Sequence, residues 1–204
     1  MFVLSLCRQL CPDKLPVEPE ERLDDGADGE VLTIAGQPDK VIKLGVIYEH
    51  PNRELTVYKQ VQRVLDYTMT TQPEAFVRVY EHGYLGTYTR KIVEWRKDHQ
   101  DFLLYYYIME KLNKISEDEK KVFHTIISHE DRGINKNYSP EKIREMLQGM
   151  SRGLDFNADK VILFCQNLQA NQVVHEDLHP RNILKNADGN FKLIDLDRCN
   201  LTPF

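Results

Sequence analysis

The sequence predicts an α+β fold in which strands come first, helices follow, and a short hairpin closes the chain. Three observations lead to this prediction. Branched and aromatic residues gather in runs of strand length over the first half of the chain, at positions 30–34, 41–44, 75–80 and 102–109. Apolar residues at three- and four-residue spacing dominate most of the second half. A polar turn at 186–190 then separates two short apolar runs.

Composition limits the classes of protein to which the chain can belong. Its 204 residues are 41% apolar, which is enough for one compact domain or for two small lobes that share a cleft. The net charge is −5 and no long run of Lys or Arg occurs, so nucleic acid is not expected as a partner. No apolar run is long enough for a signal peptide or a membrane span.

The cysteines indicate a reducing compartment. None of the four has the paired spacing of a zinc site, and we expect reduced thiols: Cys7, Cys11, Cys165 and Cys199. The expected location is therefore the cytoplasm, which includes the cytosol of a host cell if the chain is a delivered effector or a viral protein.

The distribution of prolines and apolar residues divides the chain into three stretches. Residues 1–20 contain three prolines and no sustained period, and we expect an irregular lead-in there. Residues 21–112 should form a small lobe of strands with one helix, which begins near Asn52. Residues 113–204 should form a helical lobe that also holds the final hairpin.

Two helices of the second half have recognisable starts. Ser116 and Glu119 have the spacing of a capping box, in which each side chain accepts a hydrogen bond from the other residue's backbone N–H. Ser139 precedes Pro140, which is the usual order of an N-cap residue and a proline in the first helical position. Gly153 is a credible end for the second of these helices.

Polar residues recur at fixed spacing in and around the final hairpin. His175-Glu176-Asp177 opens the stretch, Asn182 follows Asp177 by five residues, and Asp195 follows Asn182 by thirteen. This spacing resembles the catalytic loop and metal-binding motif of the protein-kinase-like superfamily. The resemblance implies a two-lobed fold, with a small β-rich N-lobe and a truncated helical C-lobe, that transfers the γ-phosphoryl group of ATP to a hydroxyl.

The chemistry of that transfer explains why these residue types are needed. The protein must position the reacting groups and neutralise charge, so it needs a carboxylate near the acceptor hydroxyl and oxygen ligands for a metal ion. Asp177 would be the base on the acceptor side, whereas Asn182 and Asp195 would hold Mg²⁺ or Mn²⁺ between the phosphates. The alternative is that these polar side chains only solvate a turn.

The resemblance extends upstream to a lysine and a glutamate. Lys43 resembles the strand lysine that steadies the ATP phosphates, and Glu54 resembles its ion-pair partner on the following helix. For Lys43 the alternative is an exposed strand lysine, because Lys40 is close by. For Glu54 the alternative is a solvent-facing helix residue, with Glu49 also available as a partner.

Two further segments resemble nucleotide-binding parts of the superfamily. Met109, Glu110 and Leu112 stand where the strand-to-hinge crossover would receive adenine, although an edge strand that ends in a polar turn has the same pattern. Gly26 and Gly29 would let backbone amides approach phosphate, although the stretch lacks the full glycine-rich pattern and a plain acidic turn explains it equally well.

Three departures from the pattern leave the acceptor open. Glu176 stands where many protein kinases have arginine, His179 where they often have lysine, and Asp197 where Asp-Phe-Gly has glycine. The stretch Asp-Leu-His-Pro-x-Asn is similar to aminoglycoside and choline kinase-like enzymes. We expect a minimal Ser/Thr protein kinase, with a small-molecule kinase (acting on a sugar, an aminoglycoside or a choline-like alcohol) and a nucleotide-binding pseudokinase as alternatives.

The chain stops nine residues after Asp195, before an activation segment and peptide platform. It therefore resembles reduced, atypical kinases. Helices between residues 113 and 157 would then support the lower lobe.

Overall fold

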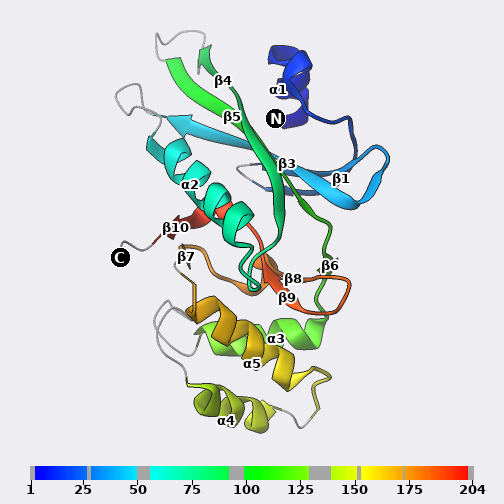
Figure 1. The fold of residues 1–204 in the computed structure, drawn as a ribbon, viewed down its shortest axis with the longest axis vertical. Coiled ribbons are helices and arrows are strands. Elements are labelled where there is room, and N and C mark those ends of the chain that lie inside the picture. Colours follow the sequence, from blue (N-terminus) through cyan, green and yellow to red (C-terminus); the bar gives the residue numbers. More distant parts are fainter. Residues whose placement is uncertain are drawn as a thin grey trace. The chain divides into compact units, whose positions relative to one another are not determined.

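The structure is a computed structural model that describes residues 3–26, 29–49, 56–91, 99–128, 139–150, 153–171 and 173–201. The predicted α+β class is confirmed, since these residues form five α-helices and a five-stranded antiparallel sheet, together with two smaller sheets (Figure 1). The chain divides into two compact units. Unit 1 consists of Met1–Leu65 and Val79–Lys111, and unit 2 of Asp66–Arg78 and Leu112–Phe204.

The large sheet belongs to unit 1. Its strands, in spatial order, are β1 (Pro19–Gly26), β2 (Gly29–Ile34), β3 (Gln37–Glu49), β5 (His99–Glu110) and β4 (Val79–Lys91). The central strands β3 and β5 pair without interruption from Lys40 opposite Glu110 to Glu49 opposite Asp101. Ile42 and Leu44 are fully buried on one face of β3. Because side chains alternate along a strand, Lys43 lies on the opposite face.

An N-terminal helix covers part of this sheet. Helix α1 (Val3–Leu10) and the short 3₁₀ helix η1 (Pro12–Lys14) occupy a segment for which the sequence predicts an irregular lead-in, and that prediction is wrong here. The physical reason is that Val3, Leu6 and Cys7 form one apolar stripe, which packs in the same core as the buried residues of β2 and β3. The prolines begin only after this helix has ended.

A buried carboxylate ties α1 to the sheet. Glu30 in β2 is only 4% exposed, and its Oε2 accepts a hydrogen bond of 2.8 Å from the backbone N–H of Leu4. The N–H groups of a first helical turn lack partners within the helix, and a negative charge is favourable there. The Arg22 guanidinium lies 3.8 Å from the other oxygen of Glu30. The acidic stretch around Gly26 is thus part of the β1–β2 hairpin, whose residues 27–28 lie outside the described residues.

Helix α2 (Thr56–Thr71) runs across the division between the units, which falls at Leu65 and Asp66. Its predicted start at Asn52 lies outside the described residues. The strand predicted for 75–80 is only partly correct, because β4 begins at Val79. The residues before it pair with β9 of unit 2 instead: the Leu193 N–H donates to the Ala75 carbonyl and the Val77 N–H to the Leu193 carbonyl, at 2.7 and 2.9 Å.

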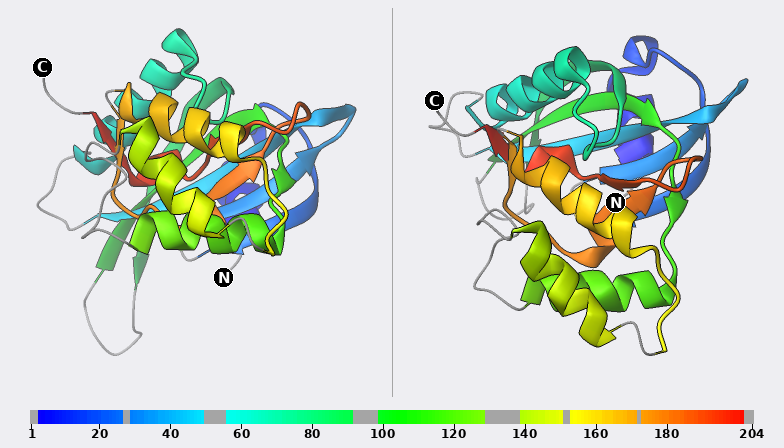
Figure 2. Two further views of the ribbon diagram at one scale, coloured as in Figure 1. Left: turned by 90° about the horizontal axis from the view of Figure 1, so that it is seen from below. Right: turned by 60° about the horizontal axis from the view of Figure 1, so that its bottom comes forward.

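The described residues of unit 2 form three complete α-helices, the end of α2 and two small sheets. The helices are α3 (Glu117–Ser128), α4 (Pro140–Met150) and α5 (Ala158–Gln169), and α4 packs against both of the others (Figure 2). One sheet joins β6 (Asn113–Lys114), β8 (Ile183–Lys185) and β9 (Phe191–Leu193), and the other joins β7 (Val173–His175) and β10 (Cys199–Leu201). Among the described residues, no helix is both long enough and apolar enough to cross a bilayer.

The predicted starts of α3 and α4 are confirmed. The Glu119 N–H donates to Ser116 Oγ at 3.2 Å, and the Ser116 N–H donates to Glu119 Oε2 at 2.8 Å, which completes the capping box. The Lys142 N–H donates to Ser139 Oγ at 3.3 Å. Local sequence signals therefore fix where both helices begin.

Removal of the Glu30 carboxylate should remove the hydrogen bond that ties α1 to the sheet, which we call the tether. We expect Glu30→Ala to lower the free energy of unfolding by about 1–3 kcal/mol, because it leaves the Leu4 N–H without its partner and removes a buried group. Urea unfolding followed by circular dichroism measures this change. Glu20→Ala, at an exposed position of the neighbouring strand, is the matched control and should have little effect. Equal effects of the two substitutions would contradict the tether.

Candidate active site

The three candidate residues Asp177, Asn182 and Asp195 lie in unit 2, in the segment between the paired strands β7 and β10, which we call the frame. Strand β7 leads into the loop that contains Asp177 and Asn182, and β10 follows Asp195 and returns to pair with β7. Cys199 stands opposite His175 in this pairing. The frame therefore begins and ends on the same two-stranded sheet, and the β8–β9 hairpin lies between its ends.

The buried imidazole of His175 connects the two polar segments of the frame. The side chain is 4% exposed, with Nδ1 3.1 Å from the backbone nitrogen of Asp177 and Nε2 3.0 Å from the carbonyl oxygen of Ile194. A backbone N–H can only donate, so Nδ1 accepts and the ring proton resides on Nε2, where it donates to Ile194. A neutral ring satisfies both contacts.

The environment of His175 favours this neutral form. Burial lowers the pKa of His175 below its ordinary value of 6.5, and this effect exceeds the opposing ones of the Ile194 carbonyl and of the Asp195 and Asp177 carboxylates. His175 thus connects two backbone groups through its neutral ring. The His-x-Asp spacing identified the residue, but this role was not predicted.

Asn182 links the loop to the hairpin through three hydrogen bonds. Its side chain is buried and its Nδ2 donates to the Asp177 carbonyl at 3.0 Å. Its backbone N–H donates to the His179 carbonyl, and its own carbonyl accepts from the Ile194 N–H at 2.9 Å. Because the amide nitrogen is committed to a carbonyl, the amide oxygen is the atom that could contact a cation.

Asp195 has a backbone conformation that few residues adopt. Its φ of 66° and ψ of 48° lie in the left-handed region, where Gln72 is the other described non-glycine residue. Aspartate tolerates this region better than most residues, yet such a conformation costs roughly 1–3 kcal/mol. Ile194, the residue before it, is held at both its N–H and its carbonyl. Strain next to a tightly held residue is a feature of functional sites.

The Asp177 carboxylate is accessible, whereas the side chains of His175 and Asn182 are buried. Its side chain is 62% exposed, and Oδ2 lies 3.6 Å from Nε2 of His179. The other ring nitrogen of His179 accepts from the backbone N–H of Arg181 at 3.1 Å, which fixes the ring. The sequence singled out His179 only as a departure from a pattern. The contact with Asp177 was missed because it depends on how the loop folds.

The described side chains do not make up a complete metal site by themselves. The described residues contain no group of three or more His, Cys, Asp or Glu side chains that could hold a metal by themselves. Asn182 and Asp195 instead offer one amide oxygen and one carboxylate. Mg²⁺ prefers such hard oxygen ligands, and in phosphate-transferring sites it takes its remaining ligands from phosphates and water. The residues therefore fit Mg²⁺ or Mn²⁺ accompanied by phosphates.

Lys43 is a buried cation of unit 1. It is 7% exposed, so the alternative of an exposed strand lysine is wrong. Its Nζ lies 5.8 Å from the centre of the Tyr107 ring on β5. Gly29 lies close to its stem, since a Cβ at Gly29 would stand 3.3 Å from Cε of Lys43 and 2.6 Å from the Leu44 carbonyl oxygen. A glycine is thus required where the hairpin meets β3.

The other predicted residues of unit 1 lie at strand ends. Gly26 pairs with Gly29 at the closed end of the β1–β2 hairpin. Met109 is buried and Glu110 ends β5, which is a central strand, so the edge-strand alternative is wrong for this segment. The chain enters unit 2 at Leu112. Glu54 lies outside the described residues.

The structure therefore brings Asp177, Asn182 and Asp195 together in unit 2, whereas Lys43 and the glycine hairpin belong to unit 1. No protein-family model matches the chain, and no curated protein has a significantly similar sequence. The chemistry of the site is accordingly inferred from its own residues.

The lowered pKa of His175 predicts how stability depends on pH. The unfolded chain takes up a proton at this residue near pH 6.5, before the folded protein does. The contribution of His175 is thus complete above that pH and is lost as the pH falls, by up to about 1.4 kcal/mol per pH unit. His175→Gln removes this titration and keeps one donor and one acceptor.

Unfolding free energies measured between about pH 7.5 and 5 test this expectation. The wild type should lose more stability than His175→Gln over this range. His124→Gln, at an exposed position of α3, is the matched control and should keep the wild-type slope. The same slope for all three proteins would show that His175 titrates normally.

Proposed function

We propose that the chain is an ATP-dependent phosphotransferase with a two-lobed protein-kinase-like fold. Unit 1 would be the β-rich lobe and unit 2 the reduced helical lobe. One observation carries the proposal: the side chains of His175 and Asn182, with the backbone of Ile194, form a continuous hydrogen-bonded network around Asp177 and Asp195. A turn that merely solvates polar side chains has no need of a buried histidine between two backbone segments.

The residues can be assigned to the needs of phosphoryl transfer. Bound Mg²⁺ or Mn²⁺ with ATP would supply the phosphoryl group and the positive charge that neutralises it. Asn182 and Asp195 would hold the metal ion through their oxygen atoms. Asp177 would accept a hydrogen bond from the acceptor hydroxyl and take its proton as transfer proceeds. The fixed loop keeps this carboxylate in place, so little reorganisation is needed at the moment of reaction.

Unit 1 would contribute the nucleotide-binding residues. The buried ammonium of Lys43 is a suitable group to contact phosphate oxygens, and Gly29 allows the hairpin backbone to lie against β3 beside it. Gly26 would close the hairpin over the phosphates. Met109, Glu110 and Leu112 would receive the adenine through backbone groups.

We favour a serine or threonine hydroxyl of a protein as the acceptor. The 62% exposed side chain of Asp177 supports this choice, because a large substrate needs an accessible carboxylate. A small-molecule kinase is the second candidate, and the imidazole of His179 beside Asp177 is the observation that favours it. The acceptor would be met in the cytoplasm. A nucleotide-binding pseudokinase would retain ATP binding without transfer.

Substitution of the two aspartates should separate metal binding from chemistry. Asp195→Ala should abolish metal-dependent ATP binding, since it removes the carboxylate ligand. Asp177→Ala should bind Mg²⁺ and ATP normally and lose roughly a hundredfold or more in transfer rate. Isothermal titration with MgATP and a rate assay measure the two effects. Asp155→Ala, at an exposed position of unit 2, is the control. Unchanged activity in both active-site variants would overturn the assignment.

The acceptor can be identified by class with labelled ATP. The purified chain, incubated with γ-labelled ATP and Mg²⁺ or Mn²⁺ in a mixed protein lysate, should transfer label to protein, and Asp195→Ala should not. Consumption of ATP without labelled protein would identify a small-molecule acceptor. Binding of ATP with no consumption would identify a pseudokinase.

A further inference from the structure

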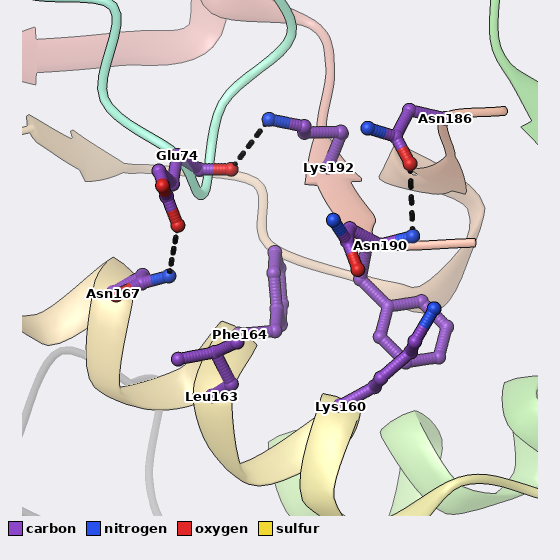
Figure 3. Close-up of a pocket in the computed structure, with 9 residues that line it drawn as sticks. Glu74, Lys160, Leu163, Phe164, Asn167, Asn186, Asn190 and Lys192 are labelled. Atoms are coloured by element: carbon purple, nitrogen blue, oxygen red, sulfur yellow. Dashed lines mark hydrogen bonds between the residues drawn. The ribbon is translucent and has the colours of Figure 1, made fainter. Parts of the chain in front are cut away.

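A polar pocket lies between α5 and the β8–β9 hairpin, within unit 2 (Figure 3). It has a volume of about 210 Å³. Lys160 and Leu163 line it from α5, Lys192 from β9, and Asn186 and Asn190 from the turn. None of these residues takes part in the proposed phosphotransferase site.

The side chains of the pocket present more donors than acceptors. Lys192 Nζ donates one hydrogen bond to the Glu74 carbonyl, at 2.8 Å, and Lys160 Nζ donates one to the Asp188 carbonyl, at 2.5 Å. Each ammonium has three hydrogens, so two remain on each. Asn186 Oδ1 accepts from the Asn190 N–H at 2.9 Å, which leaves the amide nitrogen of Asn186 as a further donor.

The charge of the pocket is positive. Its lining contains two lysines and one carboxylate, that of Glu74. The Glu74 carboxylate accepts a hydrogen bond of 3.3 Å from the side-chain amide of Asn167. Lys160 also lies in the first turn of α5, where the Asn157 side chain caps the helix by accepting from the Lys160 N–H. A positive charge is unfavourable at this end of a helix, and a bound anion would relieve that repulsion.

We propose that this pocket binds a phosphate group, held by Lys160 from the α5 side and by Lys192 from the β9 side. A phosphate dianion has three terminal oxygens and accepts more hydrogen bonds than a carboxylate does, which matches two ammonium groups and neighbouring amides. The group could be carried by a free phosphate monoester or by a phosphoserine of a protein. Both sources share this chemistry.

The pocket is distinct from the proposed metal site. Asn182 immediately precedes β8 and Asp195 follows β9 by two residues, and neither lines the pocket, which is lined by Asn186 and Asn190 of the turn and by Phe191 and Lys192 of β9. The phosphate site therefore does not depend on the phosphotransferase proposal, and either can fail alone.

Lysine-selective NMR of the full chain tests the site directly. The side-chain ¹³Cε and ¹⁵Nζ resonances of Lys160 and Lys192 should shift saturably with inorganic phosphate at constant ionic strength, with a dissociation constant on the order of 1 mM. Lys121, an exposed lysine of α3, provides the reference resonance. Shifts of Lys160 and Lys192 no larger than those caused by sodium chloride would overturn the proposal.

Asn190→Asp is the decisive variant. It places a carboxylate in the pocket with almost no change of shape, and the Asn190 N–H that bonds to Asn186 is a backbone group that the substitution retains. We expect phosphate binding to weaken at least tenfold, while Lys121→Met leaves it unchanged. Equal binding by Asn190→Asp and the wild type would overturn the proposal even if phosphate shifts the lysine resonances.

Two further ligands identify the source of the phosphate group. Titration with O-phosphoserine and with a peptide that contains phosphoserine should both compete with inorganic phosphate. Tighter binding of the peptide would identify a phosphorylated protein as the ligand. Equal binding of all three would identify a free phosphate monoester. Failure of both to compete would overturn the proposal.

Discussion

The hydrogen bond from the His175 imidazole to the Ile194 carbonyl is the contact on which the rest of the candidate site depends. It joins two segments that are nineteen residues apart, and the same ring accepts from the Asp177 N–H. Because burial keeps the ring neutral, one nitrogen donates and the other accepts, and a charged ring could not do both. Asn182 joins the same two segments a second time, because its side chain donates to the Asp177 carbonyl and its own carbonyl accepts from the Ile194 N–H. Two hydrogen bonds to the backbone of Ile194 thus restrain the chain just before Asp195, whose conformation is left-handed.

In unit 1, two successive residues of β2, Gly29 and Glu30, each contact a different neighbouring segment. Gly29 lies against the stem of Lys43 and the carbonyl of Leu44, whereas Glu30 reaches the first turn of α1. Side chains alternate along a strand, so neither contact interferes with the other. The β1–β2 hairpin is thus anchored close to its closed end, where Gly26 pairs with Gly29.

Short-range signals predicted much of this structure, and long-range contacts explain what they missed. The capping pair Ser116 and Glu119 lies within four residues, so its geometry follows from the sequence directly. The β8–β9 hairpin follows from the polar turn at 186–190 for the same reason. The packing of α1 depends instead on Glu30, which is 26 residues away, and the position of Lys43 beside Tyr107 depends on strand pairing across the sheet. No local pattern contains that information.

The β8–β9 hairpin is fixed by contacts with α3 and α5. Phe191 packs edge to face against Phe123 and Phe164, with ring centres 4.9 and 6.1 Å away. Lys185 forms an ion pair of 2.7 Å with Glu119, a carboxylate only 7% exposed that also completes the capping box of α3. Because the Glu119 carboxylate is buried, loss of Lys185 would leave its charge without this partner. Helix α3 therefore holds the turn end of the hairpin through two contacts, one at Lys185 and one at Phe191. Asn182, Asp195 and the lining of the polar pocket thus all adjoin one hairpin whose position does not depend on a bound ligand.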